Sequence, residues 1–560
     1  MTVTARSVKV EAVLKLRLRC FQAGLCLLLV GSFPSAAETQ HSFAFHEPGI
    51  FKIGRQRFDL LSPSGSAELR AHAVTLLERS TSDGALRLGK KERRGLRALV
   101  RLGELAERET SAEERSRLRH AMLEIAAAMA INHRPVVPPY VGLPDLPFRF
   151  IDSLSNPVGK GEKAAANLAL AEGVADLSLL DPQQSTFWRR PEPISSADLF
   201  SGFGRGSIPD FQGPLWRYAG PKTAGGNPGC ELVAGSRRIK VKFAETHCEP
   251  FISRIFHALG YHVEPTDYVP GLMIQYDREF FQQFNSLPEI KMKIGVFFVP
   301  IYTFHFERRY DPFSYIERVI FKDGSSCSGR EFPSLLLHRA DGKDRFKDSN
   351  FNVETETMVD HLVTREANVQ IKDKRVQSVG RWDFGGLGHQ DLRELRGAGV
   401  LAAWVGWWDA RFDNTRLAIS EAASGPELRH YFNDLGAGLG RAAGTYHHSS
   451  EQIDEFYSTF TRRSRRRGIE FPGFEPIEDN AAFREITLDD ARWMARMIAQ
   501  LTETQISSAL RASGFDREEV QAYTRKLMSR RDQLSRDTRL NQFPALSVSR
   551  PKRTVQTVTR

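Results

Sequence analysis

Three side chains with the chemistry of a cation and hydroxyl site lie in residues 409–434. Asp409 precedes Asn414 by five residues, and Asp434 follows after two short strand-like segments. A hairpin centred near residue 424 would bring Asn414 and Asp434 to facing positions roughly 5 Å apart. A carboxamide and a carboxylate can share a hard cation such as Mg²⁺ through their oxygens. Asp409, on the loop leading in, could then reach a substrate hydroxyl beside that cation.

A basic group upstream would complete such a site. Lys240 and Lys242 alternate with Val241 on a predicted strand, so both lysines lie on one face, and either could reach a phosphate. Glu249 heads the next predicted helix and could pair with a strand lysine. Gly225 and Gly226 lie in a flexible loop before the strand, where backbone N–H groups could cap phosphates.

The order of these residues resembles the protein-kinase-like superfamily. The chain contains, in this order, a strand lysine, a glutamate at the following helix, D-x-x-x-x-N, a hairpin and D-x-G. It looks closest to the groups related to HipA and the phosphoinositide kinases. More narrowly, it resembles a family of uncharacterised exported bacterial proteins. The resemblance covers roughly residues 200–535. The segments that carry it are Lys240-Val241-Lys242, Ser253-Arg254-Ile255-Phe256-His257-Ala258-Leu259-Gly260-Tyr261, Asn433-Asp434-Leu435-Gly436-Ala437 and Ala491-Arg492-Trp493-Met494-Ala495.

The resemblance implies a role for each matched residue. Lys242 would contact the α- and β-phosphates of a nucleotide such as ATP, and Glu249 would steady it. Asp409 would orient the acceptor hydroxyl and take its proton, while Asn414 and Asp434 would bind Mg²⁺ or Mn²⁺.

The sequence also departs from the kinase pattern. Trp408, and not a His-Arg pair, precedes Asp409, no clean GxGxxG is present, and no Ala-Pro-Glu segment follows. The tripeptide Asp383-Phe384-Gly385 spells a kinase metal-binding motif, but it comes before Asp409 in chain order, so we interpret it as a turn.

The strand and helix patterns around these residues predict an α+β fold. A two-lobed kinase-like domain at 215–540 would have a small sheet-containing lobe and a mostly helical lobe, with an insertion at 330–375. Strand alternation dominates before about 325, and helical periodicity dominates after 390. The predicted strands are 231–243 (a hairpin), 295–306, 315–321, 415–419 and 428–432, and the predicted helices are 250–259, 392–407, 487–501, 503–512 and 517–536.

The remaining domains are predicted from composition and periodicity. Residues 38–132 form an N-terminal helical region, expected to pack as a separate small bundle because a Pro/Gly-rich connector, 133–214, follows it. Residues 541–560 are predicted to be a disordered basic tail.

The net charge narrows the range of possible binding partners only slightly. The chain has 560 residues with 78 Lys+Arg against 68 Asp+Glu, a net charge of +10, which favours anionic partners. We expect a nucleotide and a hydroxyl-bearing acceptor, no specific nucleic acid, and a weak anionic-surface contact through Arg462–Arg467. Cys230, Cys248 and Cys327 leave open one disulfide with a free thiol or no disulfide at all.

Residues 1–37 predict export. Basic residues precede an apolar run of about ten residues and a small-residue cleavage point after Ala37, the pattern of a secretory signal peptide. The protein is therefore expected to be periplasmic or secreted. The leading hypothesis is an exported kinase-like protein that binds a nucleotide with Mg²⁺ and could transfer phosphate to a hydroxyl. The alternative is a non-catalytic, pseudokinase-like binding or envelope-associated protein.

Overall fold

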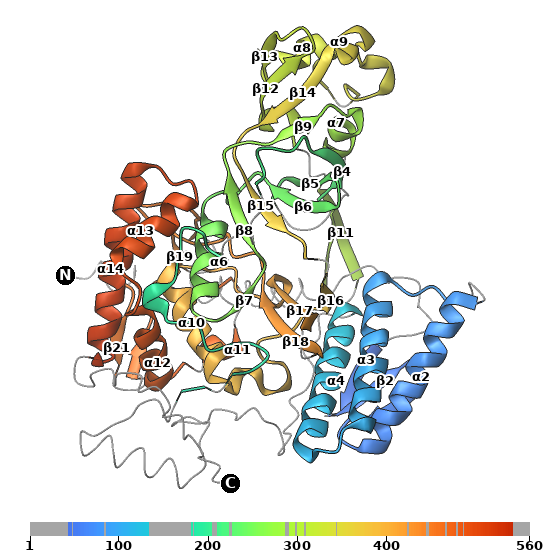
Figure 1. Ribbon diagram of the computed structural model, residues 1–560, viewed down its shortest axis with the longest axis vertical. Helices are drawn as coiled ribbons and strands as arrows, with labels where there is room; N and C mark the ends of the chain where they lie inside the picture. Colours follow the sequence, from blue (N-terminus) through green and yellow to red (C-terminus); the bar gives the residue numbers. More distant parts are fainter. Residues whose placement is uncertain are drawn as a thin grey trace, which may run out of the picture. The chain divides into compact units, whose positions relative to one another are not determined.

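The computed structural model divides into two compact units, both mixing helices and strands, so the fold is α+β as predicted (Figure 1). Within the described residues, the smaller unit is formed by Leu215–Ser236 and Met273–Arg365, and the larger by His41–Pro214, Arg237–Leu272 and Glu366–Arg560. The structure describes residues 43–540 apart from 48, 83–85, 134–180, 183, 204–209, 223–226, 286–289, 297–298, 307–309, 343, 374, 423–424, 444–446, 465–467, 478–479 and 485. The predicted signal peptide and basic tail lie outside the described residues.

The smaller unit is built on an antiparallel sheet of order β13-β12-β14-β9. Its core is aromatic: Phe280, Phe281 and Phe284 lie on one face of helix α7, and Phe281 packs against Phe313 and Phe332 at ring separations of 5.0 and 6.1 Å. Its elements are β4 (Arg217–Pro221), β5 (Gly229–Ala234), β9 (Met273–Gln275), α7 (Arg278–Asn285), β10 (Ile290–Val296), β11 (Val299–Phe306), η3 (Pro312–Tyr315), β12 (Ile316–Phe321), β13 (Ser326–Ser328), α8 (Phe332–Leu336), η4 (Asp348–Asn350), α9 (Val353–Met358) and β14 (Val359–Thr364).

The larger unit begins with a three-stranded meander and three helices that lie side by side (Figure 1). These are β1 (Phe43–Glu47), β2 (Ile50–Ile53), β3 (Gln56–Asp59), α2 (Pro63–Ser82), α3 (Lys90–Arg108) and α4 (Ala112–His133). Every residue from Met122 to Ile131 in α4 is buried, and α3 and α4 pack against strand β16 (Val376–Gly380). The prediction of a separate N-terminal bundle is therefore wrong, because a helix buried on all sides must be covered by the rest of the unit.

Two sheets of the larger unit carry the candidate site. In one, β17 (Thr415–Ala422) pairs with β16 on one side and with β18 (Gly425–Phe432) on the other, and β18 also pairs in parallel with β7 (His262–Val263). In the other, β15 (Ala367–Ile371) lies between β6 (Arg237–Lys242) and β8 (Thr266–Val269). The hairpin predicted at 415–432 is confirmed. Strand β15 lies in the segment predicted as an insertion.

The remaining helices of the larger unit pack against one another, and α6 (Cys248–Ala258) also packs against β7 and β8. The others are α10 (Arg393–Val405), α11 (Ala481–Arg484), α12 (Leu488–Ile498), α13 (Glu503–Ala512) and α14 (Arg517–Asp537), and the short elements among them are η2 (Ile194–Ser196), η5 (Gly386–Asp391), η6 (Phe412–Asn414), β19 (Ala442–Ala443), β20 (His447–His448), β21 (Arg462–Ser464) and β22 (Gly468–Glu470). Asp516 caps α14, with its side chain accepting from the Glu519 N–H. The division of the chain differs from the predicted lobes: β6 and α6 belong to the larger unit, because β6 pairs with β15 and α6 packs against α13.

Two aromatic residues anchor the described part of the connector in the core of the larger unit. Phe187 and Trp188 are 1% and 3% exposed, and the Trp188 indole N–H donates to the Leu259 carbonyl at 2.8 Å. Cys230, Cys248 and Cys327 are free thiols. Among the described helices, no segment combines the length and apolar character needed to cross a bilayer.

Candidate functional site

A buried lysine between two carboxylates is the centre of the candidate site. Lys242, at the end of β6, donates through Nζ to Glu249 Oε2 at 2.5 Å and also pairs with Asp434 Oδ1. Lys242 and Glu249 are each 1% exposed, whereas Asp434 is 27% exposed. Burial alone would lower the pKa of Lys242, but the carboxylates of Asp434, Glu249 and Glu245 outweigh it, so the pKa of Lys242 is raised. This lysine therefore stays charged.

Glu249 is fixed in place by its helix and by a neighbouring strand. It lies in the first turn of α6, and Glu451 Oε1 accepts hydrogen bonds from the backbone N–H groups of His247 and Cys248 at the start of that helix, at 2.9 and 2.6 Å. Asn368 lies opposite Lys242 in the β6–β15 register and donates through Nδ2 to Glu249 Oε2 at 2.7 Å. Glu249 Oε2 thus accepts from both strands of the sheet.

Glu245 brings a third carboxylate to the same point. Oxygen atoms of Glu245, Glu249 and Asp434 lie within 4.8 Å of one another. Glu245 and Asp434 both have left-handed backbone, with φ of 54° and 59°, an arrangement that concentrates at functional sites. Gly436 is required here, because a Cβ at that position would lie 2.3 Å from Glu245 Oε2.

This crowding of acids has an electrostatic consequence. Burial first, and then Asp434 and Glu249, raise the pKa of Glu245 to about 8, although Lys242 opposes the shift. With Glu245 protonated at neutral pH, two carboxylates still share one ammonium group, and a divalent cation could neutralise the excess negative charge.

Asp409 and Asn414 form the second half of the site. Asn414 lies at the end of η6 and donates through Nδ2 to Asp409 Oδ2 at 2.7 Å and to the Asp409 carbonyl at 2.8 Å. Arg411 Nε lies 3.0 Å from Asp409 Oδ1, but without hydrogen-bond geometry. Burial raises the pKa of Asp409, and Asp434 adds to that rise while Arg411 and Asn414 oppose it. The two halves are thus coupled through the charge of Asp434.

The predicted facing pair, Asn414 with Asp434, is wrong by one residue. Strand β17 pairs Thr415 with Phe432 and Ala422 with Gly425, so the hairpin centre falls between 423 and 424. The Asn414 carbonyl consequently accepts from the backbone N–H of Asn433 at 2.9 Å. Asp434 is the next residue, and its left-handed backbone turns the chain out of the strand, where its carboxylate meets Lys242.

The other residues that the sequence singled out can also be compared with the structure, apart from those outside the described residues. Lys242, and not Lys240, makes the buried pair with Glu249, whereas Lys240 lies opposite Gln370 in the β6–β15 register. Asp383 forms a turn as predicted, because its Oδ1 accepts from the Gly385 N–H at 2.7 Å. Gly225, Gly226 and the last three arginines of Arg462–Arg467 lie outside the described residues.

Sequence reasoning missed Glu245 and Asn368. The signal for Asn368 was present, since residues 367–371 alternate apolar and polar side chains, the pattern of a strand with one polar face. Asn368 and Gln370 lie on that face opposite Lys242 and Lys240. Glu245 has no comparable signal, because its role depends on the left-handed turn between β6 and α6.

Comparison of the chain with protein-family models, with curated proteins and with solved structures gives no match in any of the three.

Proposed function

We propose that this protein binds a nucleoside triphosphate together with Mg²⁺ or Mn²⁺ and transfers its terminal phosphoryl group to a hydroxyl acceptor. The observation that carries the proposal is the buried Lys242 held between Glu249 and Asp434. A fixed positive charge paired with carboxylates is suited to receiving phosphate oxygens, because the lysine can exchange the exposed Asp434 for a phosphate while Glu249 keeps it in place.

The acidic residues fit a hard divalent cation. Asp434 and Asn414 would hold the ion, with Glu245 adjacent to it, and all three offer oxygen ligands. Both hydrogen bonds of Asn414 to Asp409 use the amide nitrogen, so the amide oxygen is the atom with which Asn414 would bind. When bound, the cation would neutralise charge on the phosphate oxygens.

Asp409 would act as the general base. Burial raises the pKa of Asp409, which makes its carboxylate a stronger base. In the proposed step the acceptor oxygen bonds to the terminal phosphorus, the bond from that phosphorus to the bridging oxygen breaks, and the acceptor proton moves to Asp409. Asn414 would hold the base in position, and the nucleoside diphosphate would leave with the bond electrons.

The same proposal includes the arrangement of the chain. The order of β6, α6, the Asp409–Asn414 loop, the β17–β18 hairpin and Asp434 supports a kinase-like domain. With the predicted signal peptide at residues 1–37, the activity would be exported, periplasmic or secreted.

One observation favours a second candidate, a non-catalytic binding protein of pseudokinase type. Arg411 lies 3.0 Å from Asp409 Oδ1, and a guanidinium at that distance would weaken the carboxylate as a base. In that case the nucleotide and cation would bind without turnover.

Titration of the full chain with a fluorescent ATP analogue in Mn²⁺ tests the proposal. We expect saturable binding that Asp434→Asn weakens at least tenfold, whereas the matched control Asp383→Asn, from the Asp383-Phe384-Gly385 turn, leaves binding unchanged. Absence of binding with either Mg²⁺ or Mn²⁺ would overturn both candidates.

Turnover separates the two candidates. Release of phosphate from ATP, or autophosphorylation, that is lost in Asp409→Asn while nucleotide binding persists, supports the transferase. Binding of the analogue by the wild type without any transfer supports the pseudokinase-type alternative.

A further inference from the structure

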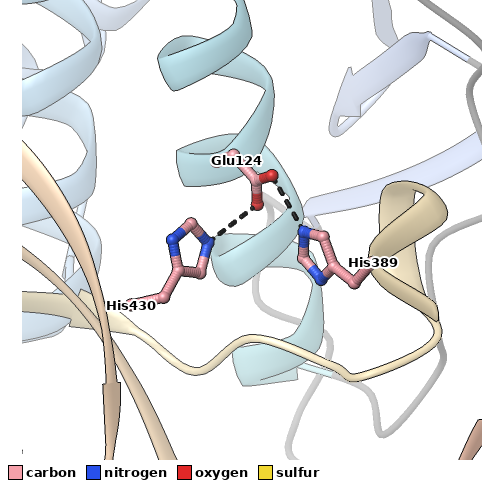
Figure 2. Close-up of side chains that lie close together, drawn as sticks. All are labelled: Glu124, His389 and His430. Carbon is pink, nitrogen blue, oxygen red and sulfur yellow. Dashed lines mark hydrogen bonds and ion pairs between the residues drawn. The ribbon is translucent and has the colours of Figure 1, made fainter. Parts of the chain in front are cut away.

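Three histidine rings converge on one buried carboxylate in the larger unit, apart from the residues discussed so far. Figure 2 shows Glu124, on α4, between His389 of η5 and His430 of β18. The Nε2 atoms of His389 and His430 lie 2.9 Å from Glu124 Oε1 and 3.2 Å from Oε2. His120, one turn earlier on α4, places its Nε2 3.1 Å from Oε1. The four residues are buried, with exposures of 6% or less.

The hydrogen bonding of His389 shows that a cation is needed at this point. Its Nδ1 lies 2.6 Å from the Asp383 carbonyl oxygen, and a carbonyl can only accept, so Nδ1 carries the proton. A neutral imidazole has one N–H, which leaves the Nε2 lone pair directed at Glu124 Oε1. Two electron pairs face each other at 2.9 Å unless a proton or a metal ion lies between them.

The contact of His389 with a backbone carbonyl is the one that histidine ligands of metal ions usually make. Histidines that bind metals usually donate the other ring N–H to a backbone carbonyl or a carboxylate, which fixes the ring and aims the lone pair at the ion. His389 has this contact with Asp383. A purely protonic network is the alternative, because the carboxylate can accept from all three rings if His389 carries a proton on both ring nitrogens.

The distances suit a first-row transition metal. Zinc binds imidazole nitrogen at about 2.0–2.1 Å and carboxylate oxygen at about 2.0–2.2 Å, so two of its ligands lie about 3.0–3.4 Å apart in common geometries. The nitrogen–oxygen separations of 2.9 Å for His389 and 3.2 Å for His430 are close to that range. Imidazole ligands select Zn²⁺ and its neighbours over Mg²⁺ and Ca²⁺.

We propose that Nε2 of His389, Nε2 of His430 and the carboxylate of Glu124 bind one transition-metal ion, Zn²⁺ being the best fit. All three of these ligand side chains are buried, so we expect the ion to have a structural and not a catalytic role. The ion would join α4 to η5 and β18, and so fasten the N-terminal helices to the sheet that carries the β17–β18 hairpin. This inference does not depend on the proposed nucleotide site.

Metal analysis of the purified full chain tests the inference directly. We expect about one equivalent of bound zinc that survives gel filtration, or that returns when chelator-treated protein is given ZnCl₂. Reloading should raise the melting temperature by roughly 5 °C at free Zn²⁺ one hundredfold above its Kd, and MgCl₂ should not reproduce the rise.

A cobalt titration covers the case in which variants fail to fold. Wild-type apoprotein given Co²⁺ should show the visible absorption of a low-coordinate nitrogen and oxygen site. His389→Gln should lose both the zinc and this spectrum, whereas the exposed control His338→Gln should keep them. Wild-type protein that takes up neither zinc nor cobalt, or a His389→Gln protein that retains its metal, would overturn the inference and leave a protonated network.

Discussion

The ion pair between Lys242 and Glu249 offers a sharp test of the site energetics. Both side chains are 1% exposed, so removal of one partner leaves a charge that water cannot reach. Breaking a buried pair costs about 3–5 kcal/mol, whereas neutralising both members costs far less. We therefore expect a double-mutant cycle at these two positions to be strongly non-additive.

The structure sets the size of each step. Lys242→Met isolates Glu249, whose remaining partner is the Asn368 amide at 2.7 Å, and should reduce the free energy of unfolding by about 4 kcal/mol. Glu249→Gln leaves Lys242 paired with Asp434 and should cost about 1.5 kcal/mol. The double variant removes both buried charges and should cost about 2.5 kcal/mol, which gives a coupling of about 3 kcal/mol.

Urea unfolding of the four proteins, followed by tryptophan fluorescence, measures the cycle. The matched control is the exposed pair of Arg101 and Glu421, which has nearly the same separation, 2.6 Å, but exposures of 48% and 39%. Its cycle should give a coupling below about 1 kcal/mol. Additivity within about 0.5 kcal/mol at the buried pair would refute the view that burial makes Lys242 and Glu249 interdependent.

Three further predictions concern the surroundings of the site. Gly397→Ala should lower the free energy of unfolding by about 1–3 kcal/mol in urea, because a Cβ there would lie 2.2 Å from the Trp493 ring; an unchanged midpoint would mean that α10 and α12 are farther apart than described. Thr487→Ala should cost about 1 kcal/mol, since Thr487 caps α12 through the Asp490 N–H, and Thr487→Ser should restore most of it. Lys240→Met should stabilise the protein at pH 7 by up to about 3 kcal/mol, because burial lowers the folded pKa of Lys240 from 10.5 to about 8. Between pH 8 and 10.5 the Lys240 side chain binds its proton more tightly in the unfolded chain than in the folded protein, so wild-type stability rises with pH. The stability difference between Lys240→Met and the wild type should therefore shrink from pH 8 to 10; a constant difference contradicts this.

Local features of the fold were accessible from the sequence. The hairpin at 415–432 and the helix with the Asp516 cap follow from alternation, periodicity and capping residues, which act within a few positions of one another. The pairing of Asn414 was missed by one residue, because the register of β17 with β18 places the hairpin centre half a residue earlier than expected and no strand pattern reports that shift.

Long-range contacts were less accessible. The approach of Glu124 to His430 joins positions 306 residues apart, and nothing in the spacing of histidines indicates it. The burial of α4 did have a signal, since residues 121–131 are almost uniformly apolar, a composition that favours a helix covered on all sides over one in an isolated bundle.

The interrupted course of the larger unit along the chain has a consequence for when the protein can fold. Lys242 and Asp434 are 192 residues apart, and the inserted segment Met273–Arg365 belongs to the other unit. At synthesis rates of about 5–20 residues per second, Asp434 is synthesised roughly 10–40 s after Lys242, its partner in the ion pair. During the first part of that interval β6 lacks β15, and throughout it α6 lacks α13, so apolar faces remain uncovered. The nascent chain therefore passes through a prolonged state that is prone to aggregation, and a holding chaperone acting on residues 237–365 would be expected to increase the yield of folded protein.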